Sequence, residues 1–246
     1  MITLNIILPF ISAAFMLVFC IVIWRRFFTR RGLHLVYWAT GLSMFTIASL
    51  SEAYLTLGWN QWAFFTWYFF GAALNAAWIG QGTLYLLFSN RRVLPYTMML
   101  IICSLAALIL MLQIMPLLNA SEFSTQVPIS EQYTTIMPPA NDGAIIRMAT
   151  PLFNVYGTIV LVGGALWSSY LFWRKRILPN RVIGNLLIAL GTLVMSLASV
   201  ITRMGLGRWL IPGELLAAGL LFIGFVVATK SRRTAMTTAM ETPHKS

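Results

Sequence analysis

Two acidic residues stand inside long apolar stretches of the sequence, where an acid needs a partner or a purpose. Glu52 belongs to the stretch 35–55, and Glu214 belongs to the stretch 210–229. A carboxylate in an apolar medium costs several kcal/mol unless a basic group, a proton or water accompanies it. We therefore take both acids as candidates for ligand binding or for a buried ion pair.

A basic partner for Glu214 stands nearby in the sequence. Arg203 and Arg208 precede it across a short turn, so we expect Arg203 or Arg208 to pair with its carboxylate. The alternative is purely structural, because Glu214 follows Pro212-Gly213 at the start of a helix, where the helix dipole favours a negative charge. Arg203 joins the two acids as a candidate site residue.

The stretch 61–88 supplies the remaining candidates. Small, amide and aromatic residues recur there at spacings of three and four, which places them on one helix face with Gln81 beside it: Gly71, Asn75, Trp78, Gly82 and Tyr85. Such a face fits a close helix crossing over the glycines. It also fits the wall of a ligand cavity, for which Asn75, Trp78 and Gln81 are the candidate contacts.

Several kinds of chemistry lack the residues they need. None of the three lysines lies in the middle of an apolar stretch, which excludes a retinal Schiff base. With two histidines, His34 and His244, neither a bis-histidine haem site nor a multi-histidine zinc site can be built. Glycine-rich nucleotide motifs and a nucleophile elbow are missing from the sequence. We expect no catalytic residue, no metal ligand and no cofactor, and we favour a protein that is not an enzyme.

The apolar stretches predict an all-α fold, a polytopic membrane helix bundle. The residue content is 59% hydrophobic and 9% charged, far less charged than soluble domains. A hydrocarbon layer about 30 Å thick requires roughly 20 apolar residues in a helix. Seven stretches of about this length or more are present: 2–24, 35–55, 61–88, 95–117, 149–173, 183–202 and 210–229.

Basic residues indicate how these spans are oriented. Of 17 lysines and arginines, 14 fall in alternate connections and the tail, while Arg147, Arg203 and Arg208 fall on the other side. By the positive-inside rule the N-terminus is outside and the C-terminus is cytoplasmic, in a bacterial plasma (inner) membrane. The net charge of +11 then indicates contact with the headgroups of the lipid bilayer, and we expect no nucleic acid partner.

Two segments lie outside the spans. The outer loop 118–148 is long, polar and proline-containing, as functional lids and mobile loops are, and both interpretations stay open. The tail 231–246 has no apolar period, and we expect it to be disordered. Residues 1–230 form one seven-helix transmembrane domain.

The layout resembles the seven-helix membrane sensor modules of bacterial histidine kinases. The similar features are the Trp24-Arg25-Arg26 ending of the first span, Glu52 late in the second, and the aromatic start and Leu84–Arg92 ending of the third. It is also similar to small bacterial seven-helix membrane proteins that stand alone. The resemblance implies a kinase or other output domain after the last span, and residues 231–246 are too few to form one.

Three hypotheses for function follow, and fold analogy alone does not decide between them. The first is a non-enzymatic sensor or accessory subunit that binds a small apolar, lipophilic or amphipathic ligand, or the helix of a membrane partner protein, in an outward-facing bundle cavity. The second is a small proton-coupled or facilitative transporter of three-plus-one-plus-three helices. It depends on an echo at an offset of 150 residues, in which Gly41 matches Gly191 and Thr46 matches Ser196. The third, an intramembrane enzyme, is the least supported.

Overall fold

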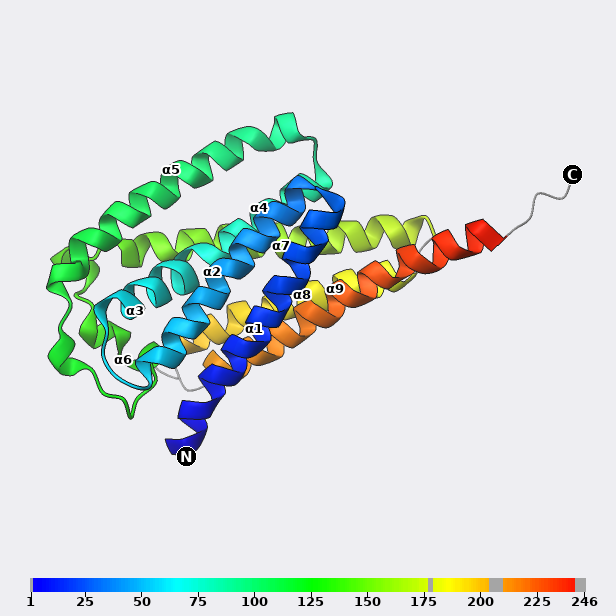
Figure 1. Ribbon diagram of the computed structural model, residues 1–246. Coiled ribbons are helices and arrows are strands. Elements are labelled where there is room, and N and C mark those ends of the chain that lie inside the picture. Colours follow the sequence, from blue (N-terminus) through cyan, green and yellow to red (C-terminus); the bar gives the residue numbers. More distant parts are fainter. Residues whose placement is uncertain (1, 177–178, 204–209, 242–246) are drawn as a thin grey trace, which may run out of the picture.

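The computed structural model describes residues 2–176, 179–203 and 210–241 (Figure 1). Within these ranges the regular structure is helical, and no strand is present. The long helices are α1 (Ile2–Arg30), α2 (Leu33–Leu55), α5 (Asn90–Ile114), α7 (Ile146–Arg174), α8 (Pro179–Arg203) and α9 (Leu210–Glu241). Shorter elements are α3 (Gln61–Thr66), the π-helix η1 (Trp67–Leu74), α4 (Asn75–Leu87), α6 (Ile129–Ile136) and the 3-10 turns η2 (Met115–Leu117), η3 (Ala120–Glu122) and η4 (Ala140–Asp142).

Six helices of the described ranges are long and apolar enough, by length and composition, to cross a bilayer, which is compatible with a multi-pass membrane protein. They cover Ile7–Arg30, Leu33–Leu55, Asn90–Leu117, Ile146–Arg174, Pro179–Thr202 and Leu210–Ala228. The other expected span, 61–88, corresponds to α3, η1 and α4, which follow one another without a break. The π-helix divides this run into pieces that are each too short to cross a bilayer alone.

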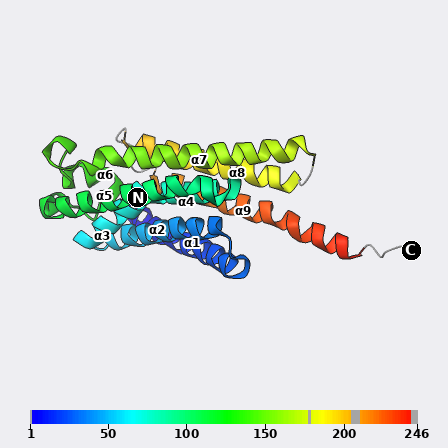
Figure 2. The ribbon, with the colours of Figure 1, turned by 90° about the horizontal axis from the view of Figure 1, so that it is seen from above.

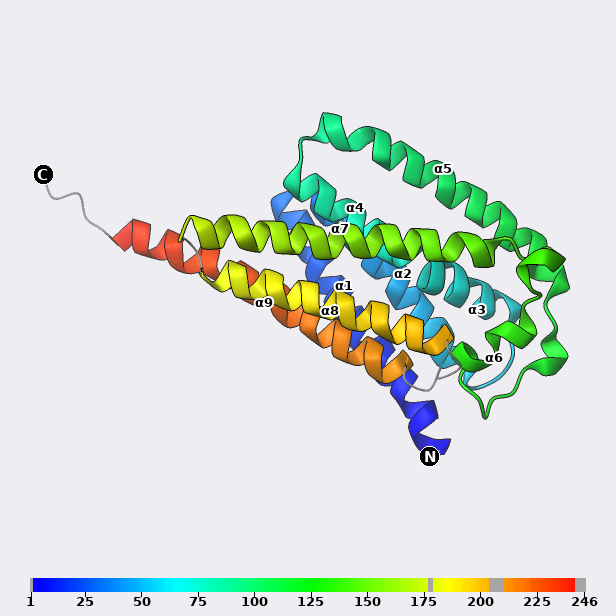
Figure 3. The same cartoon turned by 180° about the vertical axis from the view of Figure 1, so that it is seen from behind.

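The helices run up and down through one bundle, and glycines allow the closest crossings. Figure 3 shows α7, α8 and α9 side by side, and Figure 2 shows α1 beside α2. At the crossing of α4 and α7, a Cβ on Gly157 would lie 2.4 Å from the main-chain carbonyl of Ala76. At the crossing of α8 and α9, a Cβ on Gly184 would lie 2.6 Å from the carbonyl oxygen of Gly224. Small residues at such positions let helix backbones approach closely, as is typical of membrane bundles.

The two ends of the bundle differ in character. One end, which we call the basic end, holds the last turns of α1 and α7 and the first turn of α5, with Arg30, Arg91, Arg92 and Arg174. The other end, the α6 end, holds α6 and the connections from α2 to α3 and from α5 to α7 (Figure 1). This separation of charge agrees with the alternation of basic connections in the sequence.

The long connection 118–148 is folded against the bundle. It contains η3, α6 and η4, and its Ile129, Ile136, Met137 and Ala144 are buried in the same apolar core as residues of η1 and α5. These apolar side chains pack against the bundle instead of facing water. The loop is therefore a structured cover over the α6 end.

The C-terminal helix is longer than the expected last span, while the expectation of disorder for 231–246 stays a prediction. Helix α9 continues through Glu241 and extends past the basic end of the bundle (Figure 1). From Ser231 to Glu241 the sequence contains neither glycine nor proline, so nothing interrupts a helix that already has its nucleus in the apolar span. Residues 242–246 lie outside the described ranges.

Candidate functional site

Glu52 and Glu214 come together inside the bundle near the α6 end. Glu52 is one turn from the end of α2, and Glu214 is in the second turn of α9. Their side chains are 5% and 8% exposed, and the two carboxyl groups interact electrostatically. Two like charges in a medium of low polarity repel strongly, so this arrangement needs a neutralising species.

The hydrogen bonding of Glu52 is incomplete. The indole of Trp67, at the start of η1, is its hydrogen-bond partner, but the Oε1 atom is buried without any partner. A buried acceptor without a donor costs about 1–3 kcal/mol, and more if it is charged. Such an atom in a native fold calls for an explanation, such as protonation of the carboxyl group or a bound water, ion or ligand.

Two serines beside Glu52 share this property. The Oγ atoms of Ser12 on α1 and Ser49 on α2 are buried and without a partner, and with Glu52 Oε1 they are the buried unpartnered side-chain atoms found among the described residues. Ser49 lies one helical turn before Glu52. Thr46 donates a hydrogen bond to the main-chain oxygen of Met16 (3.2 Å), and because α1 and α2 are antiparallel, Ser12 and Ser49 both lie one turn from this contact toward the α6 end.

The contrast with other hydroxyls in the bundle is informative. Serines and threonines inside these helices commonly donate to the carbonyl four residues earlier, as Ser43, Thr46, Ser51, Thr192 and Ser196 do at 2.8–2.9 Å. This bond satisfies a hydroxyl in an apolar setting. Ser12 and Ser49 lack it, so their oxygens remain free for another group.

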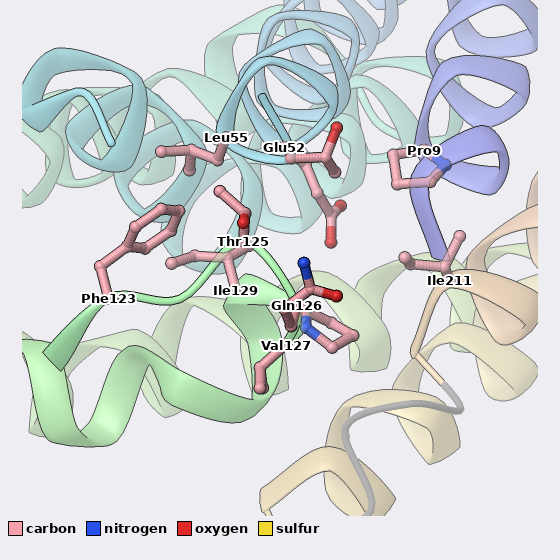
Figure 4. A pocket seen from close by; sticks show the side chains of 11 residues that line it. Pro9, Glu52, Leu55, Phe123, Thr125, Gln126, Val127, Ile129 and Ile211 are labelled. Atoms are coloured by element: carbon pink, nitrogen blue, oxygen red, sulfur yellow. The ribbon is translucent and has the colours of Figure 1, made fainter. Parts of the chain in front are cut away.

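A small cavity lies over Glu52 (Figure 4). Pro9 of α1, Leu55 of α2 and Ile211 of α9 form its sides, and the segment Phe123–Ile129 covers it. Its volume of about 20 Å³ is enough for one water molecule or an ion of that size. The cover belongs to the same loop as α6, and Trp67 contacts Tyr133 of α6 (6.1 Å between ring centroids).

Of the basic residues at the α6 end, Arg147 has a side chain that the structure describes. Arg147 donates hydrogen bonds to the main-chain oxygens of Met137 (3.2 Å) and Pro138 (3.0 Å), and its guanidinium lies over the Tyr133 ring. It therefore ties the loop to α7. The backbone of Arg203 ends α8, but its side chain and all of Arg208 lie outside what the structure describes. The expected Arg203–Glu214 ion pair accordingly stays a prediction.

The α4 candidates form a separate cluster, farther from the α6 end. Gln81 is fully buried, donates to Thr97 Oγ1 (2.6 Å) and accepts a hydrogen bond from the Tyr156 hydroxyl (2.5 Å). The Trp78 indole donates to Ser104 Oγ (3.2 Å). Asn75 is buried, and its side-chain oxygen accepts from the main chain of the next residue. These partners link α4 to α5 and α7, as a packing role requires, and none of the three lines the cavity over Glu52.

Glycines of the same face also serve packing. A Cβ on Gly71 would lie 2.7 Å from the Ala48 side chain of α2, and a Cβ on Gly82 would lie 2.4 Å from the Trp38 ring. In the structure, α2 thus crosses closely over this face. The ligand-cavity interpretation of the face has no cavity to support it among those found.

Sequence reasoning missed Trp67 and Ser12, whereas the covering segment belongs to the outer loop 118–148, for which a lid was one of the two interpretations. Trp67 belongs to the π-helix, where Asn154 of α7 donates a hydrogen bond to the Ala72 carbonyl (2.8 Å), satisfying a main-chain oxygen in the altered turn. π-Helical segments often occur at functional sites. Ser49 had a signal, because it stands three residues before Glu52 on one helix face. Ser12 had none, since only the pairing of α1 with α2 brings it near.

No protein-family model matches the chain, and no curated protein or solved structure is found to be similar to it. The function must therefore be argued from the site itself.

Proposed function

We propose that the protein is a non-enzymatic sensor or accessory subunit of a bacterial plasma membrane. In this proposal the run 61–87 is a seventh span, the N-terminus and the α6 end face outward, and the C-terminus is cytoplasmic. The α6 end receives a small apolar or amphipathic ligand, or the helix of a partner membrane protein. The similarity to sensor modules of histidine kinases is consistent with this role.

The observation that carries the proposal is the covered cavity over Glu52. An unpartnered carboxyl oxygen at the base of a cavity whose other walls are mostly apolar has the composition of a small-ligand site, in which a few polar groups orient a largely apolar molecule. The cover is a single loop segment, Phe123–Ile129, rather than a transmembrane helix. The site can therefore open by movement of this loop segment.

The size of the cavity determines how such a ligand enters. About 20 Å³ holds one water-sized group, so a larger molecule must displace the segment Phe123–Ile129. Because Trp67 contacts both Glu52 and Tyr133 of α6, displacement of the loop changes the environment of Glu52. Occupancy of the site is thus coupled to the position of the loop, as a sensor requires.

A ligand screen with blocking variants tests this proposal. The protein in lipid nanodiscs is screened against small apolar and amphipathic compounds by thermal stability. A ligand of this site raises the melting temperature of the wild type, and Val127→Trp, which fills the cavity entrance, removes the effect. Ser121→Trp, an exposed change in the same loop that does not line the cavity, is the matched control. Ligands that bind Val127→Trp as they bind the wild type would place binding elsewhere and refute the proposal.

A small transporter is the second candidate, and the carboxyl pair favours it because buried acids serve as coupling sites in transporters. Proteoliposomes with an internal pH dye measure proton flux driven by a pH gradient or by candidate solutes. Flux that Glu52→Gln abolishes and Glu131→Gln preserves supports transport. If the wild type and the Glu131→Gln variant both show no flux while ligand binding is intact, the transporter is refuted and the sensor remains.

A further inference from the structure

We propose that Glu52, Glu214, Ser12 and Ser49 bind one small hard cation, Na⁺ or Ca²⁺, that joins α1, α2 and α9 beneath the covering segment. This inference rests on the proposed function, since it names the species that holds the α6 end in its closed form. It is carried by the unpartnered oxygens, their burial, and the small cavity beside them.

The donor set consists only of oxygen. Glu52 Oε1, Ser12 Oγ and Ser49 Oγ are all buried and unpartnered, and Glu214 adds a second carboxyl group. Hard cations bind carboxylate, hydroxyl and carbonyl oxygens. No group of three or more His, Cys, Asp or Glu side chains occurs among the described residues, so a zinc-type site has no support.

Charge and size point to the same ligand. Two interacting carboxyl groups in an apolar environment must be neutralised, either by protons or by a positive charge between them, and a cation also uses the oxygens that lack donors. The adjacent space admits one water-sized group. Mg²⁺ gives up its water shell reluctantly, whereas Ca²⁺ accepts irregular oxygen coordination at 2.3–2.6 Å. A largely dehydrated ion therefore fits, and a hydrated Mg²⁺ does not.

Among the described residues, the other side chains next to the carboxyl groups do not supply a positive charge. From α1 the neighbour is Pro9, from η1 Trp67, and from the loop Gln126, all uncharged. Arg147 is engaged with main-chain oxygens of the loop. Arg203, Arg208 and protonation of the carboxyl groups are the competing ways to neutralise the pair, and the experiment below distinguishes them from an ion.

A bound ion would act as a clamp. The carboxyl groups come from α2 and α9, and one hydroxyl comes from α1, so a single ion connects helices far apart in the sequence. Removal of the ion leaves repulsion between Glu52 and Glu214, which separates α9 from α2 and loosens the cavity wall at Ile211. The ion thus stabilises the closed α6 end.

Thermal unfolding in defined salts tests the proposal. The full chain in nanodiscs of zwitterionic lipid, which limits ion binding to headgroups, is compared in choline chloride, NaCl, CaCl₂ and MgCl₂ at equal ionic strength. At a concentration of about 100 times Kd, the bound ion raises the melting temperature by about 5 °C or more. We expect this shift with Na⁺ or Ca²⁺ and a smaller one with Mg²⁺, relative to choline.

Variants assign the shift to the site. Glu52→Gln abolishes it, and Ser49→Ala weakens the apparent affinity about tenfold, the loss of one charge-assisted contact. Glu131→Gln, an exposed acid at the same end, and Ser51→Ala, a partnered serine on the same helix, retain the wild-type shift. If Glu52→Gln fails to fold, the comparison of Ser49→Ala with its control Ser51→Ala decides whether the cation binds at this site.

Two results would overturn the cation site. One is equal melting temperatures in choline, Na⁺ and Ca²⁺. A large loss of stability in Arg203→Gln or Arg208→Gln then identifies an arginine as the neutraliser, and no such loss identifies protonation of the carboxyl groups. The other is a cation shift that persists in Glu52→Gln. Neither result affects the ligand screen with Val127→Trp, so failure of the cation site and failure of the proposed function are distinguishable.

Discussion

Glu52 on α2 and Glu214 on α9 interact electrostatically inside the bundle although about two thirds of the chain separates them in the sequence. Both side chains are buried, and one oxygen of Glu52 has no hydrogen-bond partner. Burying these two carboxyl groups close together costs free energy at the α6 end of the bundle.

The coupling between the two acids is measurable by a double-mutant cycle. In choline buffer, without a bound metal cation, each single change, Glu52→Gln or Glu214→Gln, relieves the repulsion, and the double change adds little further. We expect a coupling energy of about 0.5–3 kcal/mol from unfolding in mixed micelles. The control cycle pairs Glu214→Gln with Glu131→Gln, which should be additive within about 0.5 kcal/mol. Additivity of the Glu52/Glu214 pair would contradict the interaction.

The crossing of α4 over α7 predicts a sharp difference between two glycines of α7. Gly157→Ala places a Cβ 2.4 Å from the Ala76 carbonyl carbon, and because backbone cannot rotate away, we expect a loss of about 1–3 kcal/mol. Gly163→Ala meets nothing within 4 Å and should be neutral or stabilising by up to about 1 kcal/mol, since alanine favours helix. Unfolding free energies of both variants check this. Equal effects would mean that the helices are not in close contact at Gly157.

Gln81 is expected to be structural rather than ligand-binding. Gln81→Leu removes the partner of the Tyr156 hydroxyl, and leaving that group unsatisfied costs about 1–3 kcal/mol. Adding Tyr156→Phe removes the orphaned hydroxyl, so the double variant should be more stable than Gln81→Leu alone. Thermal unfolding of the three variants tests this. A double variant no more stable than Gln81→Leu would show that the hydrogen bond does not matter.

Cysteine labelling tests the seventh span and the orientation together. In a background without Cys20 and Cys103, Leu57→Cys and Ser121→Cys at the α6 end should react with a membrane-impermeant maleimide in intact cells. Ser89→Cys, beyond α4, should react only after permeabilisation, because the run 61–87 crosses the bilayer. All three positions are exposed. Labelling of both Leu57→Cys and Ser89→Cys from the same side would refute the seventh span.

The sequence alone determined the class of molecule, because apolar length, like charge segregation, is a local property. Six spans and the separation of the basic residues to one end follow from stretches such as 95–117 and pairs such as Arg91-Arg92, without knowledge of any contact. The expectation of disorder for the tail 231–246 stays a prediction, because polarity indicates disorder whereas no residue from Ser231 to Glu241 breaks a helix.

The tertiary structure alone decided which candidates meet. Helical spacing placed Asn75, Trp78 and Gln81 on one face or beside it, but only packing showed that this face is filled by hydrogen bonds to α5 and α7. Ser12 and Trp67 join Glu52 through the pairing of α1 with α2 and through the π-helix. Those relations depend on contacts between distant segments, and an apolar span carries too little local information to specify its neighbours, because in lipid association is directed by the shapes of packed surfaces.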